Sequence, residues 1–199
     1  MAEEKDHIRD LAEIRSMMER SSKFLSLAGW AGIMAGIYAL AGVYIAHNIL
    51  HFRPDEGTPV DLPRLCLLAI AILVLAVGTA LLLSGRKAST RGERGWNATS
   101  RRLLAHMAVP LAAGGVLILI LLSQGMVGLI VPMTLIFYGL ALFNAGKFTY
   151  GEVKFMGIIQ IVLGLLAVYF VAFGLFFWAI GFGLVHIAYG IYIHYKYER

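Results

Sequence analysis

Six long runs of apolar residues, separated by short polar segments, dominate the pattern of this chain. They lie at about 24–46, 66–83, 103–123, 126–146, 155–170 and 173–194, and the charged residues fall between the runs or at their ends. A helix needs about 20 residues, at about 1.5 Å each, to cross the hydrocarbon core of a bilayer. The pattern therefore predicts an all-α domain of six transmembrane helices within residues 24–199.

A different pattern precedes the first run. In residues 1–23, Ile8, Leu11, Ile14 and Met18 recur at intervals of three or four residues among charged positions. This spacing predicts an amphipathic helix with one narrow apolar stripe. Its charges have mixed signs, whereas a helix that lies on lipid usually has a basic polar face. We expect it to dock on a partner protein, a second copy or its own bundle, with lipid as the alternative.

The composition agrees with a membrane protein. Hydrophobic residues make up 59% of the 199 residues and charged residues 15%, against about 45–50% and about 25% in soluble domains. The acidic residues near the start are untypical of a signal peptide. Cys66 is the only cysteine, which excludes a disulfide within the chain and a cysteine-based metal site.

The basic residues are unevenly distributed around the predicted spans. Of the 17 Lys and Arg residues, 15 fall on one side of the membrane, and only Arg53 and Arg64 fall on the other. This is the positive-inside pattern, which places both termini and the 85–102 segment in the cytoplasm. The net charge of +5 therefore needs no nucleic-acid partner, and the expected partner is the lipid bilayer.

Two longer polar segments connect the first three spans. Residues 48–65 contain Pro54, Pro59 and Pro63 and are predicted to be largely irregular. Residues 85–102 are polar and basic, and include a glycosylation sequon at Asn97. We interpret the sequon as coincidental because the segment is predicted to be cytoplasmic.

Four of the spans share a spacing of small residues. Each of the first, fourth, fifth and sixth spans has glycines that lie on one stripe of a helix, which lets helix backbones approach closely in lipid. These helix-packing residues are Gly29, Gly32, Gly36, Gly139, Gly146, Gly157, Gly164, Gly183 and Gly190. We expect the four spans to form the packed interior, with the second and third more exposed to lipid. Residues 138–140 and 182–184 also resemble each other, 44 residues apart, which suggests a duplicated hairpin.

Polar residues in the inner halves of the spans form a candidate intramembrane site. Gln160 and His186 each follow a stripe glycine by three positions, so the two side chains could meet. Asn144, His106 and Tyr189 are predicted at a similar depth. A polar group at membrane depth is a hypothesis for a functional site, but hydrogen bonds that simply hold helices together are also common. Both interpretations remain open.

Histidines offer two weaker metal hypotheses. His47 and His51 are four residues apart at the end of the first span and would share one face if the helix continued. His106 and His186 could ligate a haem iron or a metal from different helices. No further motif supports either site, so we expect no cofactor.

The predicted spans contain no acidic residue, and the chain contains no phosphate-binding glycine loop, so we expect no enzyme. The segments 14–22, 32–38 and 186–192 resemble a family of uncharacterised bacterial membrane proteins with six helices. The resemblance implies a bacterial inner (plasma) membrane and transfers no activity. We therefore expect a structural, regulatory or accessory membrane subunit, with a small-solute or ion transporter or channel as the alternative and a haem- or metal-binding protein as a minor one.

Overall fold

The computed structural model describes residues 28–53, 61–90 and 96–198. Within these ranges the chain is helical, without strands, and six of its helical segments are long and apolar enough to cross a membrane. The predicted six-helix, all-α fold is therefore confirmed for the described residues. The predicted amphipathic helix in residues 1–23 lies outside them.

Each predicted span corresponds to one helical segment. The first span is α2 (Gly29–Tyr44) with a π-helical end, η1 (Ile45–Ile49), and the second and third are α3 (Leu62–Thr90) and α4 (Ala98–Ser123). The fourth is α5 (Ile130–Ala145), preceded by η2 (Val127–Leu129), and the fifth is α6 (Glu152–Tyr169). The sixth, hereafter the last span, runs through η3 (Val171–Phe173), α7 (Gly174–Trp178), η4 (Ala179–Val185) and α8 (His186–Tyr197).

The second helix is longer than predicted at both ends. α3 begins at Leu62, where the Asp61 carboxylate accepts the backbone N–H of Arg64 at 3.2 Å and so caps the first turn. Pro63 is tolerated there because a first-turn residue needs no donor. The helix then continues to Thr90, through residues that we predicted to lie in the polar loop. Both predicted loops are therefore shorter than expected.

Asn97, considered above only as part of a sequon, is the N-cap residue of α4. Its side chain accepts the backbone N–H of Ser100 at 2.8 Å, and the Ser100 hydroxyl accepts the backbone N–H of Asn97 at 2.9 Å. This reciprocal capping box starts α4, and it satisfies donors that a helix leaves unpaired at its first turn.

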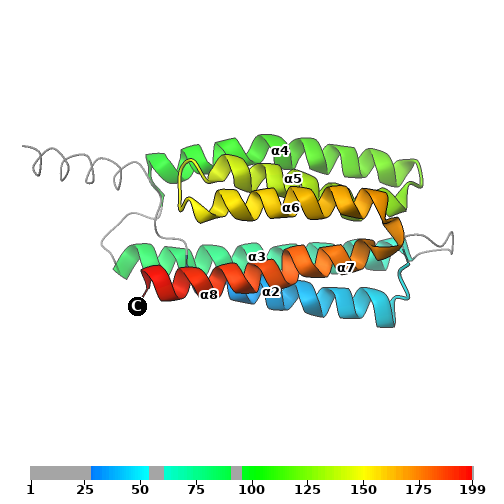
Figure 1. The fold of residues 1–199 in the computed structure, drawn as a ribbon, viewed down its shortest axis with the longest axis horizontal. Helices are drawn as coiled ribbons and strands as arrows, with labels where there is room; N and C mark the ends of the chain where they lie inside the picture. Colours follow the sequence, from blue (N-terminus) through cyan, green and yellow to red (C-terminus); the bar gives the residue numbers. More distant parts are fainter. Residues whose placement is uncertain (1–27, 54–60, 91–95, 199) are drawn as a thin grey trace, which may run out of the picture.

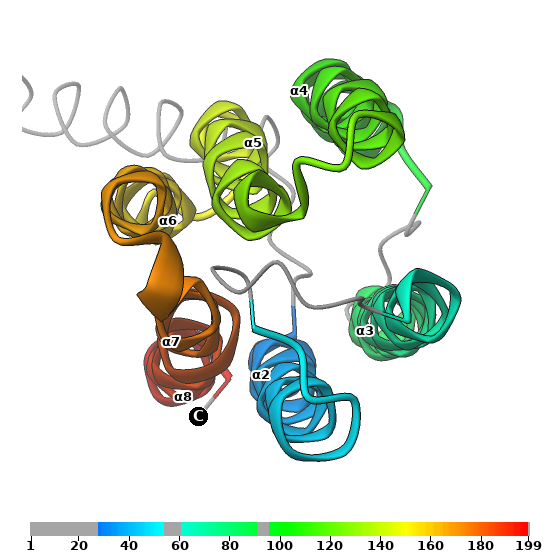
Figure 2. The same cartoon turned by 90° about the vertical axis from the view of Figure 1, so that its right-hand side faces the viewer.

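The helices form two layers of three (Figures 1 and 2). One layer contains α4, α5 and α6, and the other contains α3, α2 and the last span. α5 lies between α4 and α6, and α2 lies between α3 and α8. α3 and α4 follow each other in the chain, yet they do not pack against each other. Each has a single main partner and leaves most of its apolar surface exposed.

Glycines bring two helix pairs into close contact. A Cβ built on Gly139 of α5 would lie 2.7 Å from the carbonyl oxygen of Gly157 on α6, and the reverse distance is 2.6 Å. Between α2 and α8, a Cβ on Gly29 or Gly190 would lie 2.5 Å from the other residue's carbonyl oxygen. Atoms this close leave no room for a side chain. The remaining stripe residues also lie at these two interfaces; they are Gly32, Gly36, Gly146, Gly164 and Gly183.

Candidate functional site

The polar cluster within the bundle is built around the carbonyl oxygen of Gly181. Gln160 on α6 donates its Nε2–H to this oxygen at 2.8 Å, and Nδ1 of His186 lies 3.0 Å from it. Both side chains are buried, and Gln160 is 0% exposed. The two residues that the sequence placed in one site therefore converge on a backbone atom of the last span, without a direct bond between them.

The backbone around Gly181 is adapted to this contact. η4 is a π-helical turn, a rare geometry that is often found where a helix serves a second role. A Cβ built on Gly181 would lie 2.5 Å from Oε1 of Gln160 and 2.7 Å from Cδ2 of Leu135. Only glycine at this position lets the Gln160 amide reach the carbonyl.

Tyr138 on α5 holds the other side of the His186 ring. The Gly181 carbonyl can only accept, so Nδ1 of His186 carries the proton and Nε2 accepts from the Tyr138 hydroxyl at 2.9 Å. Phe182 stacks on the imidazole, with ring centroids 5.7 Å apart and planes 14° apart. The ring is thus held at both nitrogens and on one face.

A further cross-helix bond supports the cluster from α7. Nε1 of Trp178 donates to the Thr134 hydroxyl on α5 at 3.2 Å, and that hydroxyl donates to the carbonyl oxygen of Val131 at 2.6 Å. Together with the bonds at Gly181, this connects α5, α6 and the last span. The arrangement binds helices to one another inside the bundle.

Two buried polar atoms, Oε1 of Gln160 and the Tyr189 hydroxyl, have no hydrogen-bond partner among the described residues. Oε1 of Gln160 lies beside Gly181, since a Cβ built there would be 2.5 Å away from it. Tyr189 packs against a core cluster that includes Leu103 and Met156. Leaving a buried polar atom unsatisfied costs about 1–3 kcal/mol of folding free energy, so each of these two atoms lowers the stability of the bundle.

The other two polar candidates lie outside the cluster. His106 is exposed on α4, with its ring edge-on to Phe148 at a centroid distance of 4.6 Å. Asn144 is half-buried near the end of α5, and no hydrogen bond connects its side chain to the cluster around Gly181. The site therefore draws on three helical segments and not on α4.

The metal hypotheses gain no support from the geometry. η1 ends at Ile49, and His51 adopts a left-handed φ of 52°, so His47 and His51 do not share a continuing helical face. Among the described residues, no three His, Cys, Asp or Glu side chains are grouped so as to hold a metal ion. Both ring nitrogens of His186 are engaged within the protein, and no pair with His106 forms.

A carboxylate clamp closes the end of the bundle that contains the C-terminus. Glu198 accepts from the backbone N–H of Gly29 at 2.7 Å and from Lys87 Nζ at 2.8 Å, and His194 Nδ1 lies 2.6 Å from it. The side chains of Lys87 and Glu198 are only 12% and 13% exposed. Burial of the Glu198 carboxyl works to raise its pKa, but these three hydrogen bonds outweigh burial and lower the pKa to about 2. The clamp joins α2, α3 and the end of α8.

A second carboxylate links the two layers at the same end. Glu152 at the start of α6 accepts from Lys196 Nζ at 2.6 Å and from the Tyr197 hydroxyl at 3.0 Å. The Tyr197 ring also packs on Tyr150, with centroids 4.3 Å apart. α8 is therefore tied to the α5–α6 hairpin at this end as well as at Gly181.

Sequence reasoning missed Tyr138, Gly181 and Glu198. The sequence contains one signal for Tyr138. The resemblance between residues 138–140 and 182–184 aligns Tyr138 with Phe182, and in the structure the centroids of these two rings lie 4.9 Å apart. Glu198 lies beyond the last predicted span, and no pattern in the sequence connects it with Gly29 or Lys87.

Comparison with known protein families, curated proteins and solved structures finds no match to this chain.

Proposed function

We propose that this chain is a multi-pass protein of a bacterial inner membrane, with both termini in the cytoplasm, that acts without catalysis as a structural, regulatory or accessory subunit. The support comes from how its polar residues are used. Tyr138, His186 and Gln160 are hydrogen-bonded across helices, as expected for groups that stabilise a bundle in lipid. Meanwhile α3 and α4 keep broad apolar faces that no other described helix covers.

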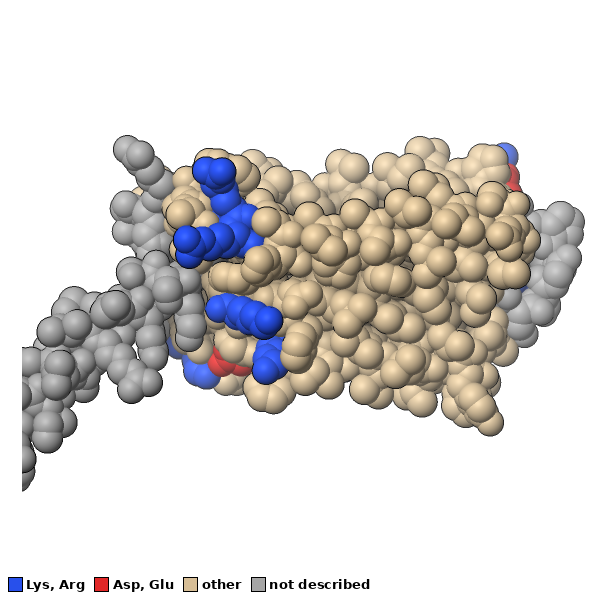
Figure 3. Space-filling model, turned by 90° about the horizontal axis from the view of Figure 1, so that it is seen from above, with Lys and Arg blue, Asp and Glu red and all other residues tan. Residues whose placement is uncertain are grey.

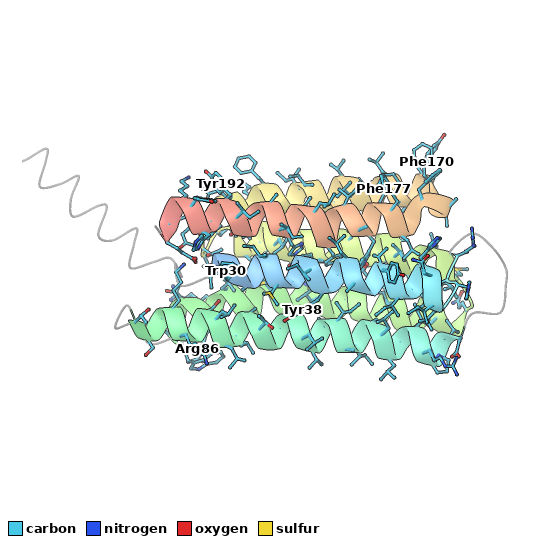
Figure 4. The ribbon with its side chains drawn as sticks, turned by 90° about the horizontal axis from the view of Figure 1, so that it is seen from below. Trp30, Tyr38, Arg86, Phe170, Phe177 and Tyr192 are labelled. Atoms are coloured by element: carbon cyan, nitrogen blue, oxygen red, sulfur yellow. The ribbon has the colours of Figure 1, made fainter. Side chains whose placement is uncertain are left out.

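The orientation is supported by the distribution of charge. Among the described Lys and Arg residues, only Arg53 and Arg64 lie at the end away from the C-terminus. Trp30 and Tyr192 lie at the same end as Arg86, whereas Phe170 and Phe177 lie at the other (Figure 4). Basic residues favour the cytoplasmic side and so set the orientation, whereas Trp and Tyr mark either membrane interface without distinguishing the two sides.

Cysteine labelling tests the orientation. In a Cys66→Ser background, an impermeant maleimide added to intact spheroplasts should label Ser123→Cys, in the exposed turn before α5, and leave Lys147→Cys unlabelled. Lysis should then expose Lys147→Cys. The reverse pattern would overturn the proposed orientation.

The single observation that carries the proposed function is a contrast: the polar side chains at Gly181 bond other helices of the bundle, whereas α3 and α4 leave most of their apolar surface uncovered by the described helices. A photo-crosslinking residue at Val74 on α3 or Val109 on α4, both well exposed, should give discrete protein adducts in native membranes. The same residue at Leu135, which is 0% exposed, is the matched control. Adducts with lipid alone at both exposed positions would contradict a subunit role.

The predicted N-terminal helix provides a separate test of docking. Deleting residues 1–20 should change the oligomeric state or the pattern of crosslinked partners, without lowering the thermal stability of the bundle. An unchanged pattern on both counts would remove the N-terminal helix as a docking element.

A transporter or channel is the second candidate, and the unsatisfied atoms favour it. Oε1 of Gln160 and the Tyr189 hydroxyl are buried without a described partner, so each offers a hydrogen-bonding group to water or to a small polar solute. Cysteines at 160 and 189, in the Cys66→Ser background, should then react with small water-soluble reagents. Positions sealed from both sides would exclude this candidate.

A further inference from the structure

Four exposed cationic or titratable side chains lie near one another on the outer face of the α4–α5–α6 layer. Arg102 and His106 are four residues apart on α4 and therefore share a face. The His106 ring contacts Phe148, which directly follows Lys147. Lys154 lies in the first turn of the neighbouring helix α6, and a Cβ built on Gly146 would lie 2.9 Å from its backbone nitrogen. We name Arg102, His106, Lys147 and Lys154 the basic patch.

Within the described ranges, no acidic residue balances the basic patch. Among the described residues at this end, the carboxylates are Glu152 and Glu198, and they pair with Lys196 and Lys87. No described carboxylate pairs with the basic patch. Figure 3 shows the basic side chains gathered at one end of this face, with an uncharged surface beyond them. The positive-inside rule explains why basic residues lie at this end of the bundle. It does not explain why several of them lie on one face without a described carboxylate as partner.

An apolar strip continues from the basic patch toward the middle of the membrane. Ile158 and Leu165 follow Lys154 by four and eleven residues on the same face of α6, and both are exposed. On α5, Leu140 is also exposed, and Lys147 lies in the turn just beyond the end of this helix. Lys154 Nζ lies 4.9 Å from the centroid of the Phe143 ring, so its stem already runs along the apolar surface. Cations thus sit above hydrocarbon-facing side chains.

We propose that the basic patch binds the headgroup of an anionic phospholipid whose acyl chains lie along Leu140, Ile158 and Leu165. The phosphate supplies a negative charge that no described carboxylate supplies to the patch, and the apolar strip suits acyl chains but not a free anion. The inference rests on the proposed membrane location, because the patch must lie at the lipid interface. Each cation near an anionic headgroup contributes a factor of about five in affinity.

Native mass spectrometry of the detergent-solubilised full-length chain tests the proposal. The protein is titrated with dioleoyl phosphatidylglycerol and, separately, with dioleoyl phosphatidylcholine, which has the same acyl chains and no net charge. We expect phosphatidylglycerol to bind at least about 10-fold more tightly. Lys147→Gln/Lys154→Gln should weaken phosphatidylglycerol binding about 30-fold, and Lys147→Arg/Lys154→Arg should restore it.

Arg86→Gln/Arg101→Gln is the matched control. It removes two exposed basic residues at the same end, neither of them in the basic patch or paired with a described carboxylate, and it should change the affinity less than about threefold. An equal loss in both double variants would show a general effect of charge and overturn the site. If millimolar inorganic phosphate displaced phosphatidylglycerol as effectively as an equal concentration of the lipid does, the apolar strip would have no role in binding.

Alkaline extraction of membranes keeps the two proposals separable. If the wild-type chain resists extraction but shows no preference for phosphatidylglycerol, the lipid site is wrong and the membrane location stands. If the chain is extracted by alkali, the membrane location itself fails.

Discussion

Glycines in the close-packed helix pairs and most glycines on α3 and α4 face different surroundings. The exception is Gly114 on α4, where an added Cβ would lie 2.5 Å from Cβ of Phe137. At Gly139, Gly157 and Gly190, an added Cβ would lie within 2.7 Å of a backbone oxygen of the neighbouring helix. At Gly78 and Gly85 on α3 and Gly115 on α4, no atom lies within 4 Å. The residue type is the same, but only the first group holds two helices together.

This difference divides the bundle into two kinds of helix. α5–α6 and α2–α8 are close-packed pairs, and they are connected through the hydrogen bonds at Gly181 and through Glu152. α3 and α4 each attach to one side of a pair and present apolar side chains elsewhere. In lipid such surfaces cost little, because the surroundings are as apolar as the side chains. Mutations should therefore have very unequal effects in the two groups.

The largest effect is expected where backbones touch. Gly139→Leu would force a side chain against the carbonyl oxygen of Gly157 and the backbone of Ile161, and neither can move without separating α5 from α6. We expect a loss of about 3 kcal/mol or more in the free energy of unfolding, measured in detergent by thermal or denaturant titration. Gly78→Leu on α3 is the control and should unfold like wild type. Equal losses at the two positions would contradict the division into two kinds of helix.

The Glu198 clamp offers a milder way to loosen an outer helix. Glu198→Gln keeps the shape but weakens the bonds to Lys87 and to the backbone N–H of Gly29, which should cost about 1–3 kcal/mol. Hydrogen exchange should increase near Ser84 and Lys87 on α3, while the α5–α6 pair stays protected. Exchange that rises equally in α5 and α6 would show that the clamp supports the whole bundle.

The same carboxylate predicts a dependence on pH. Its pKa in the folded chain is about 2, below its ordinary value of 4.5, so the folded state favours the charged form. The stabilisation is complete above about pH 4.5 and is lost as the pH falls toward 2. Wild type should therefore lose stability over this interval by more than Glu198→Gln does, in matched unfolding titrations. Parallel curves for the two proteins would remove the clamp as the cause.

The sequence predicted the spans and the helices with close contacts better than it predicted the polar contacts. Hydrophobic runs and glycine spacing are local patterns, and each span became a helix at nearly the expected place. The extension of α3 beyond its apolar run depends on the Asp61 cap and on Ser84 and Ala88 becoming buried, which a polar loop composition does not indicate. The acceptor shared by Gln160 and His186 is a backbone oxygen, and no side-chain pattern can reveal one.

The central cluster should respond less than the glycine contacts. Tyr138→Phe removes the hydroxyl that donates to Nε2 of His186 and leaves the rings in place. We expect a loss of about 1 kcal/mol, and a double-mutant cycle with His186→Phe should show coupling of similar size. Independent effects of the two changes would mean that this bond contributes nothing to stability.

The smallest effect, with the opposite sign, is expected on the exposed glycines. Gly78 lies in the middle of α3 with open space around it, so its cost is only the low helix propensity of glycine, about 1 kcal/mol relative to alanine in water. Gly78→Ala should therefore raise the free energy of unfolding slightly, by about 0.5 kcal/mol or less in detergent. Gly157→Ala should lower it, because a β-carbon would lie 2.6 Å from the Gly139 oxygen. If Gly78→Ala stabilises the protein in detergent but destabilises it in native membranes, Gly78 contacts a second protein there. α3 would then belong with the packed helices.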